Sequence, residues 1–145
     1  MATGKVPQDT MAGIDVSELE GVTAEIAAAL LAHGIQTTTQ LLAATGRPLA
    51  RVRLAEILGL DLNVLFEVTK RADLLRIDGL TVADVHCLGL AGVDSVTELG
   101  RRIPENLYVK LLRVATREHR QQPPRLDEVK RWVKQAKQLH RVVYC

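Results

Sequence analysis

Apolar residues recur at intervals of three and four along most of the chain, which is the spacing of one face of an α-helix. The stretch after Pro48 carries Leu49, Val52, Leu54, Ile57 and Leu58. The stretch from Leu126 to His140 carries Val129, Trp132, Val133, Ala136 and Leu139. Strict alternation of apolar and polar residues, which marks a half-buried strand, does not occur. The pattern predicts an all-α fold.

Capping residues, glycines and prolines divide this pattern into helices. Threonine, serine and aspartate side chains cap the first free amides of a helix, and glycine often follows its last turn. Proline fits the first turn, and paired prolines cannot continue a helix. We therefore expect a short helix that ends at residue 19 and a linker at 121–124. Further helices are expected over residues 23–34, 48–59, 61–72, 81–92 and 126–140, and three more are expected to begin at residues 37, 95 and 104.

Two stretches match when the chain is shifted by 58 positions, from Leu19 to Ile77. Internal similarity at a fixed spacing indicates that one supersecondary unit occurs twice. The matched pairs are Leu19 and Ile77, Gly21 and Gly79, Val22 and Leu80, Thr23 and Thr81, Gly34 and Gly92, Ile35 and Val93, Thr37 and Ser95, Gln40 and Glu98, and Leu41 and Leu99.

The matched residues are of the kinds that shape a backbone. Gly21 and Gly79 suit turns, because glycine accepts a positive φ without steric cost. The segments Thr37–Gln40 and Ser95–Glu98 both have the form of a capping box, in which two side chains and two amides bond reciprocally. We therefore expect two equivalent helical units, each followed by arm helices.

These residues resemble the helix-hairpin-helix superfamily, in which two short helices flank a hairpin of the form apolar-x-Gly-apolar-Gly and the second helix is rich in alanine. More specifically, the chain resembles a bacterial domain family of unknown function built from tandem units of this kind. The resemblance covers residues 14–140 and is closest in residues 72–80. It makes the hairpins second-choice candidates for contact with DNA phosphates, after the basic C-terminal residues, and their residues are Gly21, Val22, Thr23, Gly79, Leu80 and Thr81.

Both hairpins depart from the family pattern at the second glycine, where Thr23 and Thr81 stand. A glycine at that position lets a backbone amide approach a phosphate closely. No lysine follows either hairpin, and the acids Glu20 and Asp78 would repel a phosphate. This chemistry favours hairpins that act as packing corners over hairpins that hold DNA.

Composition indicates a globular protein with an aliphatic core, because 47% of the 145 residues are hydrophobic and only 3% are aromatic. Apolar runs such as residues 26–32 are far shorter than the ~20 residues that cross a bilayer. Residues 1–7 have no apolar core of a secretory signal. We expect a cytoplasmic protein that does not enter a membrane.

The same signals predict how the chain is organised. We expect residues 1–12 to be a disordered lead-in, 13–72 to form the first helix-hairpin-helix unit with its arm helices, 73–141 to form the second with basic arm helices, and 142–145 to be a tail. The two units are expected to pack as one compact helical domain.

No constellation typical of catalysis or metal binding occurs in the sequence. Cys87 and Cys145 lack the C-x-x-C spacing, and adjacent His86 and Cys87 would point about 100° apart on a helix. Motifs for a nucleophile elbow, a phosphate-binding loop or a zinc protease are missing. We expect Cys87 to be a core residue, and we expect no enzyme activity, no cofactor and no metal.

Charge is distributed unevenly along the chain. Residues 101–145 hold twelve Lys/Arg and four Asp/Glu, a net charge of +8, whereas residues 1–100 hold seven and thirteen, a net charge of −6. Basic residues recur every three or four positions in two predicted helices, which gathers them on one side of each. The candidate phosphate contacts are Arg113, Arg117, Arg120, Lys130, Arg131, Lys134 and Lys137.

This asymmetry leaves three interpretations open. The basic face can bind the backbone of DNA or RNA without much sequence preference, it can be a solvated face without a role, or it can pair with the acidic part of the same chain or of a second copy. We expect a non-catalytic DNA-binding module. The alternative is a protein-interaction or scaffold module of the same fold that does not bind nucleic acid.

Overall fold

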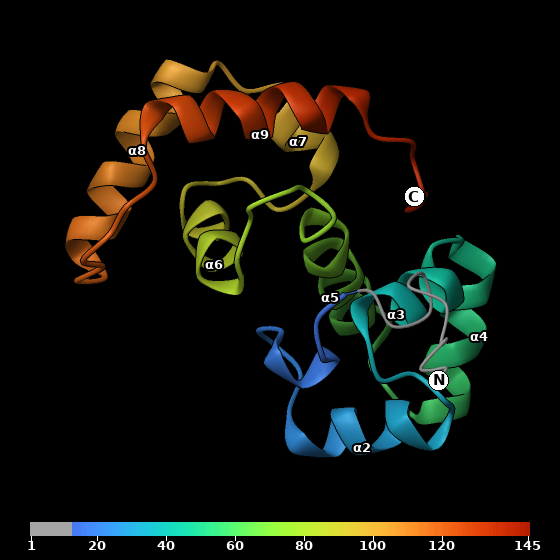
Figure 1. Cartoon of the computed structure of the whole chain (residues 1–145). Coiled ribbons are helices and arrows are strands. Elements are labelled where there is room, and N and C mark those ends of the chain that lie inside the picture. Colours follow the sequence, from blue (N-terminus) through green and yellow to red (C-terminus); the bar gives the residue numbers. More distant parts are fainter. Residues whose placement is uncertain (1–12) are drawn as a thin grey trace, which may run out of the picture. The chain divides into compact units, whose positions relative to one another are not determined.

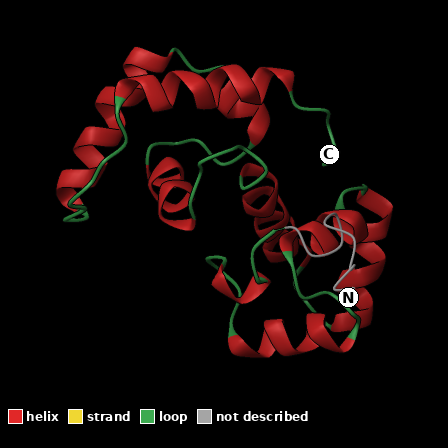
Figure 2. Ribbon diagram, viewed as in Figure 1, coloured by secondary structure: helices red, strands yellow, loops and turns green. Residues whose placement is uncertain are grey.

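The computed structural model describes residues 13–145, which form one 3₁₀ helix and eight α-helices without a strand (Figures 1 and 2). This confirms the predicted all-α class. The elements are η1 (Val16–Glu18), α2 (Ala24–Ala32), α3 (Thr38–Thr45), α4 (Pro48–Leu58), α5 (Leu62–Leu74), α6 (Val82–Leu90), α7 (Val96–Gly100), α8 (Pro104–Arg117) and α9 (Leu126–Gln138). The predicted lead-in lies outside the described residues.

The chain divides into two compact units. The first contains the described residues up to Asp73 together with Arg141–Cys145, and the second contains Leu74–His140. The sequence prediction had placed the boundary after residue 72 and had left residues 142–145 as a separate tail. In the structure these last residues are part of the first unit.

The backbone takes the same local path in both matched stretches. Gly21 and Gly79 have φ of +91° and +81°, which explains why glycine stands at each turn. Amide-to-carbonyl hydrogen bonds also recur at positions 58 residues apart. The pairs are Val22–Leu19 and Leu80–Ile77 (3.2 and 3.1 Å), Ile35–Leu30 and Val93–Leu88 (2.9 and 2.8 Å), and Leu41–Thr37 and Leu99–Ser95 (2.9 and 3.0 Å).

Only one of the two predicted capping boxes is complete. Thr37 accepts a hydrogen bond from the Gln40 amide, and the Gln40 side chain bonds the Thr37 amide in return. Ser95 likewise accepts from the Glu98 amide at 3.1 Å. The Glu98 carboxylate, however, accepts from Arg102 at 3.3 Å, so the reciprocal bond to Ser95 is missing. Competition from a nearby guanidinium explains why this prediction was wrong.

The second unit is built around α9, which packs against α7 and α8, while α6 packs against α8 (Figure 1). Trp132 is 3% exposed and lies in the middle of the buried face of α9. Cys87 is buried in the same core, as predicted. The other core residues include Leu74, Ile77, Leu88, Val93, Leu99, Leu107, Leu111, Val129, Val133 and Ala136.

The first unit has a buried arginine on α4, the helix for which the sequence predicted an apolar stripe. In α4, Arg51 is 5% exposed, whereas Leu49 and Ile57 are 60% and 66% exposed. The apolar stripe predicted for this helix is therefore wrong in its orientation. The reason is that the guanidinium of Arg51 donates to the carbonyls of Thr45 and Gly46 at 3.0 Å each and lies 4.3 Å from the ring centre of Phe66.

The same arginine holds the last residues of the chain. Arg51 Nη2 donates to the Tyr144 carbonyl at 2.7 Å, and the Tyr144 amide donates to the Gly46 carbonyl at 2.8 Å. Arg47 lies over the Tyr144 ring at 4.8 Å. Burial lowers the pKa of Arg51, yet arginine is protonated at any physiological pH. Three carbonyl oxygens therefore surround a buried positive charge.

Replacing Gly46 with alanine is expected to release these last residues. The new Cβ would clash with the Val142 carbonyl oxygen, although the backbone of Gly46 is helical and tolerates a side chain. Overpacking of this kind lowers the free energy of unfolding by about 1–3 kcal/mol. Thermal unfolding measures the loss, and hydrogen exchange at the Tyr144 amide reports the release.

Gly89→Ala is the matched control, because Gly89 lies exposed in α6 with no atom within 4 Å of the added Cβ. It is expected to stabilise the protein by up to about 1 kcal/mol, since alanine is the better helix former. A Gly46→Ala protein that melts like the wild type and keeps the Tyr144 amide protected would contradict the packing argument.

Candidate functional site

The predicted basic residues of the last helix lie on its outer face. Every third or fourth residue of α9 faces the core, so the residues between them are directed to solvent. The exposed cations are Lys130, Arg131, Lys134 and Lys137. The buried residues opposite them are Val129, Trp132, Val133 and Ala136.

Two of these four cations already have acidic partners. Arg131 donates to Asp127 at 3.2 Å, and Lys130 lies 3.7 Å from Glu105. Hydrogen bonds from Arg125 and Arg131 hold the pKa of Asp127 below its ordinary value, so this carboxylate is ionised at neutral pH. The N-terminal half of the α9 face is therefore close to neutral.

Lys134 and Lys137 differ from this pair. Within residues 13–145 no ion pair or hydrogen bond engages either ammonium group. The two residues are three positions apart, so their side chains leave the helix about 5–6 Å from each other. They are the uncompensated charges of the α9 face.

Arg120 has a structural partner inside the second unit. Its guanidinium donates to Asp84 at 2.5 Å, and Asp84 is only 5% exposed. Burial lowers the pKa of Arg120, but the hydrogen bond and the charge of Asp84 raise it by more. Asp84 also completes a capping box with Thr81 at the start of α6. Arg120 thus ties the segment after α8 to α6, and its charge is not available to a ligand.

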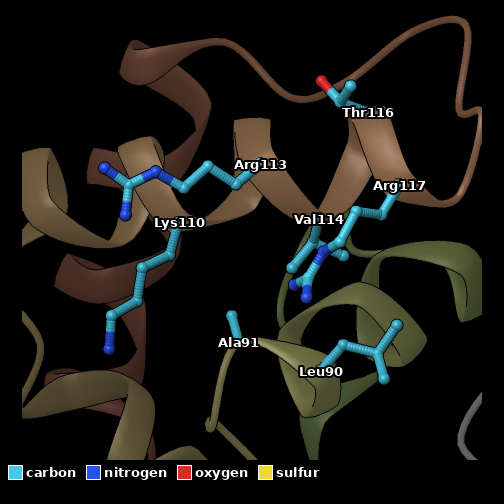
Figure 3. A pocket seen from close by; sticks show the side chains of 7 residues that line it. All are labelled: Leu90, Ala91, Lys110, Arg113, Val114, Thr116 and Arg117. Carbon is cyan, nitrogen blue, oxygen red and sulfur yellow. The ribbon is translucent and has the colours of Figure 1, made fainter.

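Arg113 and Arg117 lie elsewhere, on the C-terminal half of α8. They line an open pocket of about 610 Å³ between α8 and the end of α6 (Figure 3). Lys110 lines the same pocket, and the sequence analysis missed it although it precedes Arg113 by one helical turn. The remaining lining residues are Leu90, Ala91, Val114 and Thr116. No hydrogen bond or ion pair within residues 13–145 engages the three cations.

The two cation groups occupy different ends of the second unit. Lys130 meets Glu105 in the first turn of α8, so α9 crosses α8 near the N-terminus of α8. Arg117 is twelve positions farther along this helix, about 18 Å at 1.5 Å per residue. The structure therefore does not gather the predicted contacts into one cluster.

The hairpins use their polar groups internally. The amides of Val22 and Leu80 bond to carbonyls of the same turn, and the Thr81 amide bonds to Asp84. The Glu20 carbonyl accepts from Arg71, and the Asp78 amide donates to Gln135 at 3.0 Å. Thr23 and Thr81 cap α2 and α6. These contacts are those of a turn that positions a helix.

Among residues 13–145, no three His, Cys, Asp or Glu side chains are grouped so that they could hold a metal ion. In the same range no helix combines the length and the apolar character needed to cross a bilayer.

The chain belongs to the family described as a domain of unknown function, DUF4332, whose profile matches residues 20–139. This agrees with the expected membership of an uncharacterised domain family. Searches of curated proteins and of solved structures gave no match.

Proposed function

We propose that the protein is a non-catalytic module that binds the phosphate backbone of nucleic acid, with DNA as the expected ligand. The observation that carries the proposal is the pair Lys134 and Lys137, which are exposed on one face of α9 without an acidic partner among residues 13–145. When unpaired surface cations contact phosphates, they displace the counterions condensed on the nucleic acid, and this release drives association without sequence readout. Lys130 and Arg131 flank this pair and contribute less, because acids neutralise them.

The scaffold for this surface is, on our proposal, a tandem of two helix-hairpin-helix units. The positive φ of Gly21 and Gly79 and the hydrogen bonds that recur 58 positions apart support this interpretation. In each proposed unit, two arm helices follow the paired short helices, α4 and α5 in the first and α8 and α9 in the second. The hairpins serve as packing corners, since their amides are already bonded.

Charge removal on α9 tests the proposal. Fluorescence anisotropy with labelled duplex DNA, single-stranded DNA and RNA, titrated from about 50 to 200 mM salt, gives the affinity and its salt dependence. Lys134→Gln/Lys137→Gln is expected to weaken duplex binding and to reduce the slope of log K against log salt by about 1.8, because two phosphate contacts are lost.

The matched control is Lys130→Gln/Arg131→Gln, which removes the same charge from the same helix. Because these cations are already paired, we expect a clearly smaller change in slope. Equal effects of the two double variants would show that only net charge matters. Absence of binding by the wild type at low salt would exclude the nucleic-acid proposal and favour the alternative, a protein-interaction or scaffold module. The exposed Leu49 and Ile57 of α4 support that alternative.

A further inference from the structure

The pocket between α6 and α8 combines positive charge with an apolar centre. Leu90 is 49% exposed at its edge, although it is a large aliphatic residue. Ala91 and Val114 line it as well. In Figure 3, Ala91 lies between the ends of Lys110 and Arg117, which extend from α8 toward the end of α6.

This arrangement differs from that of the α9 face. A duplex backbone presents charge and sugar, so an apolar wall adds nothing to its binding. A single-stranded base stacks best on aromatic rings, and the residues that line this pocket include none. An aliphatic wall beside cations instead matches a peptide that carries an apolar side chain between carboxylates.

We propose that this pocket is a docking site for an acidic segment of another protein, in which one leucine-like side chain is flanked by glutamate or aspartate. The apolar side chain packs against Leu90, Ala91 and Val114. Carboxylates on either side of it meet Lys110 and Arg117, which are seven positions or about 10 Å apart along α8. Arg113 also lines the pocket, although its side chain extends away from Leu90 and Ala91 in Figure 3.

At this pocket, unpaired cations lie beside apolar side chains. No carboxylate is among the residues that line the pocket, and none pairs with its cations in the described part of the chain. Elsewhere in the second unit, Arg120 has Asp84 and Arg131 has Asp127 as acidic neighbours, whereas Lys134 and Lys137 are unpaired but are not among the residues that line this pocket. A partner that supplies carboxylates would pair these cations, and the pocket also presents apolar side chains that can receive an apolar group.

Nuclear magnetic resonance can test the site, because it detects weak binding residue by residue. The probe is the blocked peptide Glu-Glu-Leu-Glu-Glu, added to the ¹⁵N-labelled protein of residues 1–145. We expect saturable shifts of the amides of Leu90, Ala91 and residues 110–117. The peptide Glu-Glu-Ser-Glu-Glu, of equal charge, is expected to bind at least about fivefold more weakly, because it buries no aliphatic side chain.

Two variants separate this site from the nucleic-acid surface. Arg113→Gln/Arg117→Gln is expected to weaken the leucine peptide about fivefold or more while leaving duplex DNA binding little changed. Lys134→Gln/Lys137→Gln is expected to weaken duplex DNA binding while leaving the affinity for the leucine peptide little changed. Leu90→Gln alters no charge and, because Leu90 is half exposed, should leave the melting temperature nearly unchanged while weakening the leucine peptide.

Three results would overturn the inference. One is the absence of shifts at this pocket with the leucine peptide. Another is equal affinity for the leucine and serine peptides, which would reduce the site to nonspecific charge. The third has three parts: DNA shifts the amides of residues 110–117, the Arg113→Gln/Arg117→Gln variant binds DNA more weakly than the wild type, and the peptide causes no shifts. This result would assign the pocket to the nucleic-acid surface. If only Lys134→Gln/Lys137→Gln loses DNA binding, the pocket is separate from the nucleic-acid surface, and the peptide titration then decides whether the pocket binds an acidic segment.

Discussion

Replacing Trp132 with alanine is expected to lower the free energy of unfolding of the second unit by about 3–5 kcal/mol, because the change removes a large side chain from a close-packed core and leaves a cavity. Trp132 is 3% exposed and lies on α9, the helix that packs against both α7 and α8. A loss of this size is a large part of the total stability of a small domain.

Circular dichroism at 222 nm during urea unfolding measures the effect, since Trp132 is the only tryptophan and its removal abolishes the fluorescence signal. Trp132→Phe, which keeps an aromatic ring, should lower the free energy of unfolding by less than Trp132→Ala does. Val109→Ala is the surface control on α8, because Val109 is 45% exposed. Val109→Ala should change the free energy of unfolding by no more than about 0.5 kcal/mol. Equal losses for Trp132→Ala and Val109→Ala would show that the core does not depend on this residue.

The second large effect is expected at the pair formed by Arg120 and Asp84. Arg120→Met leaves the carboxylate of Asp84 buried without its cation, which costs about 3–5 kcal/mol. Asp84→Asn costs less, about 1–3 kcal/mol, because the Arg120 side chain is 21% exposed and can turn toward water. Chemical denaturation near pH 7 compares the two.

The double variant decides whether the pair itself is responsible. Asp84→Asn/Arg120→Met should be more stable than the sum of the single changes predicts, since neither charge is then left alone. Additive losses would mean that the pair is not coupled. Duplex DNA affinity serves as a second readout. Arg120→Met should leave it unchanged under conditions where the protein is folded, in contrast to the sequence-based assignment of Arg120 to the phosphate contacts.

Local signals in the sequence predicted most of the helix boundaries. Thr23, Thr37 and Thr81 act as caps, and Gly21 and Gly79 occupy turns with positive φ. Each of these roles is decided by neighbours within four residues, which the sequence displays directly. The all-helical class follows from the same information.

Two of the errors concern partners that are distant in sequence, whereas the incomplete capping box at Ser95 has a local cause in Arg102. The guanidinium of Arg51 bonds the nearby carbonyls of Thr45 and Gly46 and also the carbonyl of Tyr144, 93 positions away, and the last contact cannot be predicted from a local pattern. Arg120 was predicted to be a phosphate contact, because its partner Asp84 is 36 positions earlier and the pairing cannot be read from the residues near Arg120. The pocket cation Lys110 could have been found from its spacing to Arg113 and Arg117, but its apolar neighbours come from α6 and required the structure.

The contact between Arg51 and Tyr144 also bears on the order in which the protein is made and folds. The first unit needs residues that are synthesised after the whole of Leu74–His140. Closing a long flexible loop is entropically costly, and a loop that contains an already folded unit behaves as a shorter one. We therefore expect the second unit to fold before the first is complete, so that on the ribosome the part translated earliest becomes fully native last.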